Sequence, residues 1–118
     1  LISGATELPG GRFVVAEVKV PDRKDLAQLS DQIKSRLEKG VVFLVAEIDS
    51  SVALVCGINE AIAEKGVSAG NLVRKAAGIM GGSGGGRPDF AQGGGGEPAL
   101  IGEALSWVRD ELRKELSG

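Results

Sequence analysis

The alternation of apolar and polar positions divides the chain into strand-like and helix-like segments. Residues 12–20 mix β-branched with polar side chains and end at Pro21, as a strand should. Residues 41–48 and 52–58 are nearly continuous apolar runs with the length of buried strands, and the polar residues 49–51 separate them. The pattern therefore predicts three strands, of which the last two form a hairpin.

Three further segments carry apolar residues at helical spacing. The first runs from about residue 23 to 39, and Gly40 stands where a helix would stop. The second begins after Ser68, whose side chain can cap a helix, and reaches about Met80. The third is expected from about Pro98 to Leu116, because proline suits the first turn of a helix.

The order strand, helix, strand, strand, helix, glycine-rich loop, helix predicts an α/β or α+β fold. We expect a small mixed β-sheet packed with about three helices, and a glycine-rich loop between the last two helices. With 118 residues, 42% of them apolar, residues 1–118 are expected to form a single globular domain. The chain begins at Leu1 and its only methionine is Met80, so we expect a fragment of a larger protein.

Composition excludes several classes of function. No apolar run approaches the roughly 20 residues of a membrane span, and the only cysteine, Cys56, lies in an apolar run, so we expect a buried thiol in a cytoplasmic protein. With no histidine, the chain lacks the usual general base and the usual zinc ligands, so neither a catalytic residue nor a metal site is expected. The net charge of −2 requires any binding to RNA to be local.

The segment from Gly81 to Gly96 is the compositional outlier, since nine of its sixteen positions are glycine. It could be a flexible linker, or it could allow tight packing of a turn and a short strand. Alternatively, successive backbone N–H groups could face a phosphate or ribose, aided by Ser83, Arg87 and Gln92. An ATP-binding phosphate loop is excluded, because arginine replaces its lysine and proline replaces its hydroxyl residue.

The runs 69–77 (AGNLVRKAA) and 81–95 (GGSGGGRPDFAQGGG) resemble the signature at the end of alanyl-tRNA synthetases. The upstream strand, helix and hairpin also resemble that domain, which is related to the C-terminal domain of DHH-type phosphoesterases. The resemblance implies a non-catalytic domain that contacts the outer corner of tRNA and helps couple aminoacylation with editing. It also implies that ATP, magnesium and zinc belong to other domains of the parent ligase, and that a preceding helical segment could form a homodimer.

Two other functions stay open at this stage. The chain could be a structural or dimerisation module of the synthetase. It could also be the nucleotide-holding domain of a DHH-type phosphoesterase, although the equivalent glycine motif there carries a histidine.

The resemblance assigns nucleic-acid binding to the glycine motif, within which we expect Asp89 to orient Arg87 or the loop. Arg74 and Lys75 add local positive charge on the preceding helix. The candidate nucleic-acid-binding residues are Gly81, Gly82, Ser83, Gly84, Gly85, Gly86, Arg87, Asp89, Gln92, Gly93, Gly94, Gly95, Arg74 and Lys75.

Overall fold

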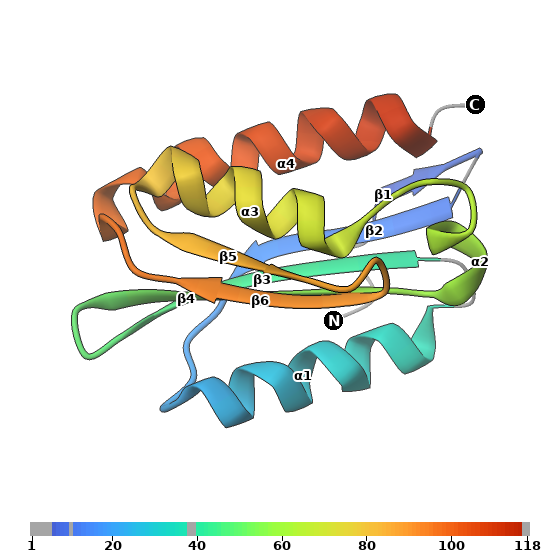
Figure 1. Cartoon of the computed structure of the whole chain (residues 1–118). Coiled ribbons are helices and arrows are strands. Elements are labelled where there is room, and N and C mark those ends of the chain that lie inside the picture. Colours follow the sequence, from blue (N-terminus) through green and yellow to red (C-terminus); the bar gives the residue numbers. More distant parts are fainter. Residues whose placement is uncertain (1–5, 10, 38–39, 117–118) are drawn as a thin grey trace.

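The computed structural model describes residues 6–9, 11–37 and 40–116, and this part of the chain forms one six-stranded mixed sheet (Figure 1). The strand order is β1-β2-β3-β4-β6-β5. Among the described strands, only β2 and β3 pair in parallel, and the other neighbours are antiparallel. The strands are β1 (Thr6–Leu8), β2 (Gly11–Glu17), β3 (Gly40–Ile48), β4 (Ser51–Ile58), β5 (Ser83–Gly86) and β6 (Phe90–Gly94).

Helices cover both faces of the sheet, which gives three layers. Helix α1 lies on one face, whereas α3 and α4 lie on the other (Figure 1). The α1 helix also makes the crossover between the parallel strands β2 and β3. The helical elements are α1 (Arg23–Arg36), α2 (Glu60–Ala63), α3 (Ala69–Met80), the 3-10 turn η2 (Pro98–Leu100) and α4 (Ile101–Leu116).

The central strands β3 and β4 are apolar along almost their whole length because both of their faces are buried. Leu44 and Val55 belong to the apolar cluster beneath α1. Phe43 and Leu54 belong to the larger cluster beneath α3 and α4. Continuous apolar runs are expected of strands covered on two sides. The predicted hairpin of two buried strands is thereby confirmed, as is the mixed α/β fold.

Two predicted boundaries are wrong by a few residues. Helix α1 ends at Arg36, because Leu37 takes an extended conformation with φ −97° and ψ 126°, and Gly40 opens β3 instead of ending the helix. Residues 38–39 of the predicted helix lie outside the described residues. Strand β2 ends at Glu17, although the Val18 amide still donates to the Val45 carbonyl oxygen at 2.8 Å. The chain then leaves the sheet toward α1.

The predicted glycine-rich loop is the main correction. Strands β5 and β6 form an antiparallel hairpin inside this segment, and β6 pairs with β4 as part of the sheet. Glycine has low strand propensity, so the pairing is imposed by the neighbouring strand and by α3 above the hairpin. The short elements β1 and α2 were also not predicted. The cap at Ser68 is confirmed, since its hydroxyl accepts from the Asn71 amide at 3.3 Å.

No helix in the described part of the chain is long and apolar enough to cross a bilayer.

Candidate nucleic-acid interface

On its α3 side, the β5–β6 hairpin packs so closely that its glycines have no room for a side chain. A Cβ atom at Gly84 would lie 2.6 Å from the Gly93 Cα and 2.7 Å from the Val73 Cγ1. At Gly93, the same atom would lie 2.9 Å from Val73 Cγ1. Real side chains do not tolerate such distances, so these glycines are required for the packing of α3 on the hairpin. The structural interpretation of the motif holds for this side.

The opposite side of the hairpin is uncovered around Ser83, Gly85 and Gln92. Gln92 pairs with Val55, which faces α1, and Gly85 pairs with Gln92, so both residues face the α1 side. Ser83 is two positions from Gly85 and faces the same way. However, α1 packs against β3 and β4, so Ser83 and Gln92 are exposed and Gly85 is partly exposed. We call the surface formed by Ser83, Gly85 and Gln92 the open face.

Gly85 differs from its neighbours because nothing requires it to be glycine. A Cβ atom at Gly85 would have no heavy atom within 4 Å, and its φ lies outside the left-handed region. By contrast, Gly81 has φ 86° where α3 ends, a conformation that favours glycine. Gly85 therefore keeps the main chain of the open face accessible without serving the packing of the domain.

Arg87 lies at the tip of the hairpin, and its position is fixed through its backbone. The Arg87 amide donates to the Phe90 carbonyl oxygen at 2.9 Å, and the Arg87 carbonyl oxygen accepts from the Gly70 amide of α3 at 3.1 Å. The guanidinium Nε lies 3.4 Å from Asp89 Oδ1, and the Arg87 side chain is 75% exposed. Asp89 is thus placed beside Arg87, while most of the guanidinium faces solvent.

Other candidate residues lie elsewhere. Arg74 and Lys75 are exposed on α3, in the layer opposite the open face, and Arg74 Nη2 donates to Asn71 Oδ1 at 2.6 Å. Phe90 is partly buried against the apolar cluster beneath α1, so its ring packs with the core. The structure therefore groups Ser83, Gln92 and Arg87 on the hairpin, and separates Arg74 and Lys75 from them.

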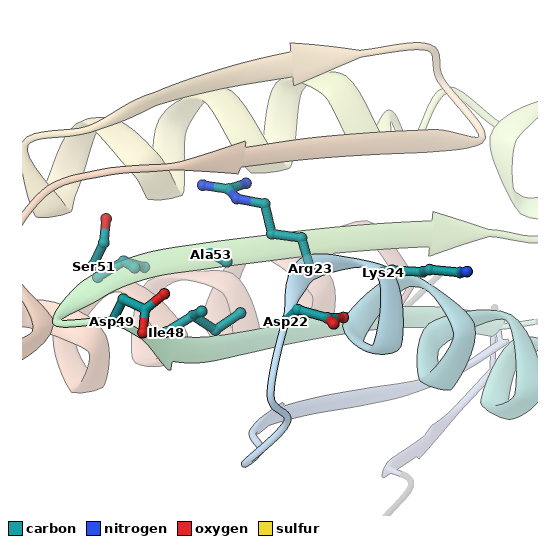
Figure 2. A pocket seen from close by; sticks show the side chains of 8 residues that line it. Asp22, Arg23, Lys24, Ile48, Asp49, Ser51 and Ala53 are labelled. Carbon is teal, nitrogen blue, oxygen red and sulfur yellow. The ribbon is translucent and has the colours of Figure 1, made fainter.

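Arg23 adjoins the candidate interface and was not predicted from the sequence. It begins α1, and its Nη1 donates to the Gly93 carbonyl oxygen at 3.2 Å. Figure 2 shows the side chain reaching from α1 across β4 toward β6. No sequence pattern points to this contact, because 70 positions separate the two residues.

Neither a metal site nor a reactive thiol is found among the described residues. No group of three or more histidine, cysteine, aspartate or glutamate side chains within this part of the chain could hold a metal ion. Cys56 is fully buried in the centre of the sheet. Burial raises the pKa of its thiol well above the ordinary value, and the Lys34 ammonium acts in the opposite direction with a smaller effect. The expectation of a buried, structural cysteine is confirmed.

Comparison with known proteins finds relatives among tRNA ligases. The chain is 42% identical over 112 residues to an alanine–tRNA ligase of Oceanobacillus iheyensis, covering 95% of this chain and 13% of the relative. It is 40% identical over 107 residues to an alanine–tRNA ligase of Staphylococcus saprophyticus, covering 91% of this chain and 12% of that protein. The chain thus spans only a small part of the relatives it matches.

Two solved structures have a similar fold. The C-Ala domain of Aquifex aeolicus alanyl-tRNA synthetase superposes with a TM-score of 0.80 at 29% identity, covering 97% of this chain and 98% of that domain. A DHH-domain protein described as a member of a family of ribosomal proteins gives a TM-score of 0.63 at 18% identity. That likeness covers 93% of this chain and 27% of the other, and it shows the fold alone.

The family match extends over nearly the whole described part of the chain. Residues 10–114 match the DHHA1 domain, a span that includes the glycine hairpin and all the helices up to α4. The chain therefore belongs to the DHHA1 domain family.

Proposed function

We propose that this chain is the C-terminal domain of an alanine–tRNA ligase and that it contacts tRNA through the open face and Arg87. The relatives named alanine–tRNA ligase and the C-Ala domain support the first part. The observation that carries the second part is Gly85, a glycine that packing does not require, on the edge strand β5 between Ser83 and Arg87. A ligand that approaches the main chain closely would explain why glycine occupies this position, because any side chain would stand in its way.

Folded RNA offers the groups that such a surface can bind. Phosphates and ribose 2′-hydroxyls can approach main-chain groups where no side chain intervenes, and Ser83 and Gln92 supply hydrogen-bonding side chains beside Gly85. Arg87 adds an exposed cation at the hairpin tip. Because the chain carries a net charge of −2, we expect weak binding that depends strongly on salt.

In the whole ligase, this domain would hold the outer corner of the tRNA while the acceptor end reaches the aminoacylation and editing sites. Those sites, with their ATP, magnesium and zinc, belong to other domains in this proposal. The preceding helical segment would supply any dimer contact. The domain's own role in this proposal is to position the tRNA.

The packing of Gly84 and Gly93 against Val73 favours a purely structural role for that part of the motif. The two roles are compatible, because they concern opposite faces of the same hairpin. They can be separated only by variants that change one face at a time.

The test is titration of the chain with tRNA for alanine at low and moderate salt, for wild type and the Arg87→Ala variant. Arg113→Ala removes the same charge from an exposed site on α4 and serves as the control. We expect saturable binding that Arg87→Ala weakens by about 1 kcal/mol or more, with an unchanged melting temperature. Absence of binding at low salt, or equal losses for both variants, would contradict the proposal.

A further inference from the structure

A groove of about 530 Å³ adjoins the open face, where the chain enters α1 and where β3 turns into β4. Its floor is apolar and belongs to β3 and β4, whereas charged groups stand at its ends (Figure 2). The lining residues are Asp22, Arg23, Lys24, Ile48, Asp49, Ser51, Val52 and Ala53. No candidate residue from the sequence lies in this groove.

Arg23 connects the groove to the hairpin. Its guanidinium lies against Gly94, where any Cβ atom would collide with Nη2, and Nη1 donates to the Gly93 carbonyl oxygen at 3.2 Å. Among the described residues, no ion pair with an acid is found for Arg23. One carbonyl uses one of the five N–H donors of a guanidinium, so most of its hydrogen-bonding capacity is available to an anion.

We propose that Arg23 binds a backbone phosphate of the RNA, so that the strand crossing the open face continues over β4 into the groove. This inference rests on the proposed function. The hydrogen bond to Gly93 orients the guanidinium before the ligand arrives, and a planar guanidinium suits the geometry of a phosphate. The chemical class recognised is a phosphodiester, and the apolar floor lies beneath the adjoining sugar.

Asp49 defines which end of the groove the phosphate occupies. It sits in the turn between β3 and β4, away from Arg23 along the groove (Figure 2). Its carboxylate repels a phosphate and so favours the Arg23 end, where the Asp22 carboxylate caps α1 by accepting from the Asp25 amide at 2.9 Å and points away from the guanidinium (Figure 2). Removing that negative charge should strengthen binding of RNA in the groove. Asp49 has φ 52°, a conformation that asparagine adopts readily, so Asp49→Asn preserves the turn.

Lys24 provides a matched control. It is adjacent to Arg23 and equally charged, but Figure 2 shows its side chain extending away from the Arg23 guanidinium. If only the overall charge near α1 mattered, the loss of either residue would weaken RNA binding equally. If Arg23 contacts a phosphate, its loss alone has a large effect.

The experiment measures the affinity of fluorescent tRNA for alanine for the 118-residue chain at several salt concentrations. We expect Arg23→Ala to weaken binding roughly tenfold, as for one charge-assisted hydrogen bond, and to lower the salt slope by about 0.7 to 0.9. Lys24→Ala should change affinity less than about twofold, and Asp49→Asn should raise it at low salt. If melting curves show that Arg23→Ala loosens the hairpin, Arg23→Gln is used, because glutamine keeps an aliphatic stem with a polar end and removes the charge.

Equal effects of Arg23→Ala and Lys24→Ala, or an unchanged salt slope for the Arg23 variants, would overturn the inference. If the wild-type chain binds tRNA, and Arg87→Ala weakens that binding while the Arg23 variants bind normally, only the proposal about Arg23 and the groove is wrong. If the wild-type chain binds no tRNA at low salt, both the proposed function and the proposal that RNA enters the groove are wrong.

Discussion

The carbonyl oxygen of Gly86 lies 2.6 Å from the point where Gly70 would carry a Cβ atom. Helix α3 therefore begins in direct backbone contact with the hairpin. The Ala69 amide donates to Pro88 O at 2.8 Å, and the Gly70 amide donates to Arg87 O at 3.1 Å. These carbonyls accept from amides that the first turn of a helix normally leaves unpaired. The hydrogen bonds therefore attach the tip of the hairpin to the start of α3.

A first prediction concerns this contact. Gly70→Ala should lower the free energy of unfolding by about 1 to 3 kcal/mol, because the methyl group would collide with Gly86. Gly78→Ala, in the same helix but with no atom within 4 Å of the added Cβ, should raise it by about 0.5 to 1 kcal/mol. Urea denaturation of both variants measures the difference. Equal changes of the same sign would mean that α3 does not press on the hairpin.

A second prediction separates the two faces of the hairpin. Gly84→Ala should destabilise the domain by about 1 to 3 kcal/mol, because its methyl group meets Gly93 and Val73. Gly85→Ala should leave the melting temperature nearly unchanged and weaken tRNA binding, because its methyl group projects from the open face. Normal RNA binding by the Gly85 variant would argue against the open face as the binding surface.

A third prediction concerns Ser30, which α1 buries against β4. Its hydroxyl has no hydrogen-bond partner among the described residues and is fully buried. Ser30→Ala should raise the free energy of unfolding by about 1 kcal/mol, since it removes an unsatisfied polar group and alanine favours helix. Ser35→Ala is the control, because the exposed Ser35 hydroxyl donates to the Gln32 carbonyl oxygen at 2.9 Å. A loss of stability in the Ser30 variant would show that its hydroxyl is satisfied.

A fourth prediction follows from the buried thiol of Cys56. Burial raises its pKa in the folded state, so the unfolded state loses its proton first as the pH rises. The contribution of this thiol to the free energy of unfolding is fully present below the ordinary pKa of 9.0. Above that pH, the free energy of unfolding falls by about 1.4 kcal/mol per pH unit. Denaturation between neutral and alkaline pH should show a steeper loss for wild type than for Cys56→Ala. If the free energy of unfolding changed with pH in the same way for wild type and Cys56→Ala, the burial of the thiol would be contradicted.

Thiol labelling gives an independent readout for Cys56. A thiol reagent at mildly alkaline pH should react slowly with the folded chain and completely after unfolding, because the reactive species is the thiolate. Fast labelling of the folded protein would contradict the position of Cys56 at the centre of the sheet.

The central elements could be predicted from the sequence because their signals are local. The apolar runs around Phe43 and Leu54 need only their own composition to identify them as buried strands, and the helical stripe of α3 begins at a recognisable cap, Ser68. The glycine hairpin has no such signal. Its pairing depends on β4 and its glycines depend on α3, so it becomes visible only when those elements are in place.

Only part of the candidate site could be predicted, because its local signals are visible in the sequence and its contacts between distant elements are not. The glycine motif marked the segment in which the candidate interface lies, but composition could not distinguish Gly85 from Gly84, since only the packing of α3 does so. Arg74 and Lys75 were near in sequence and lie in the other layer. Arg23 was distant in sequence and lies against Gly94. Proximity across a sheet is set by the crossover between β2 and β3, which no local pattern encodes.

The contact between α3 and the hairpin also limits what the glycine motif can reveal in other chains. A relative that had changed its ligand, or lost it, would still need glycine at positions such as Gly84 and Gly93 in order to fold. Finding the motif therefore identifies an architecture. A change of ligand would be recorded at Ser83, Gly85 and Gln92, where substitutions cost the fold little and alter what the surface can touch.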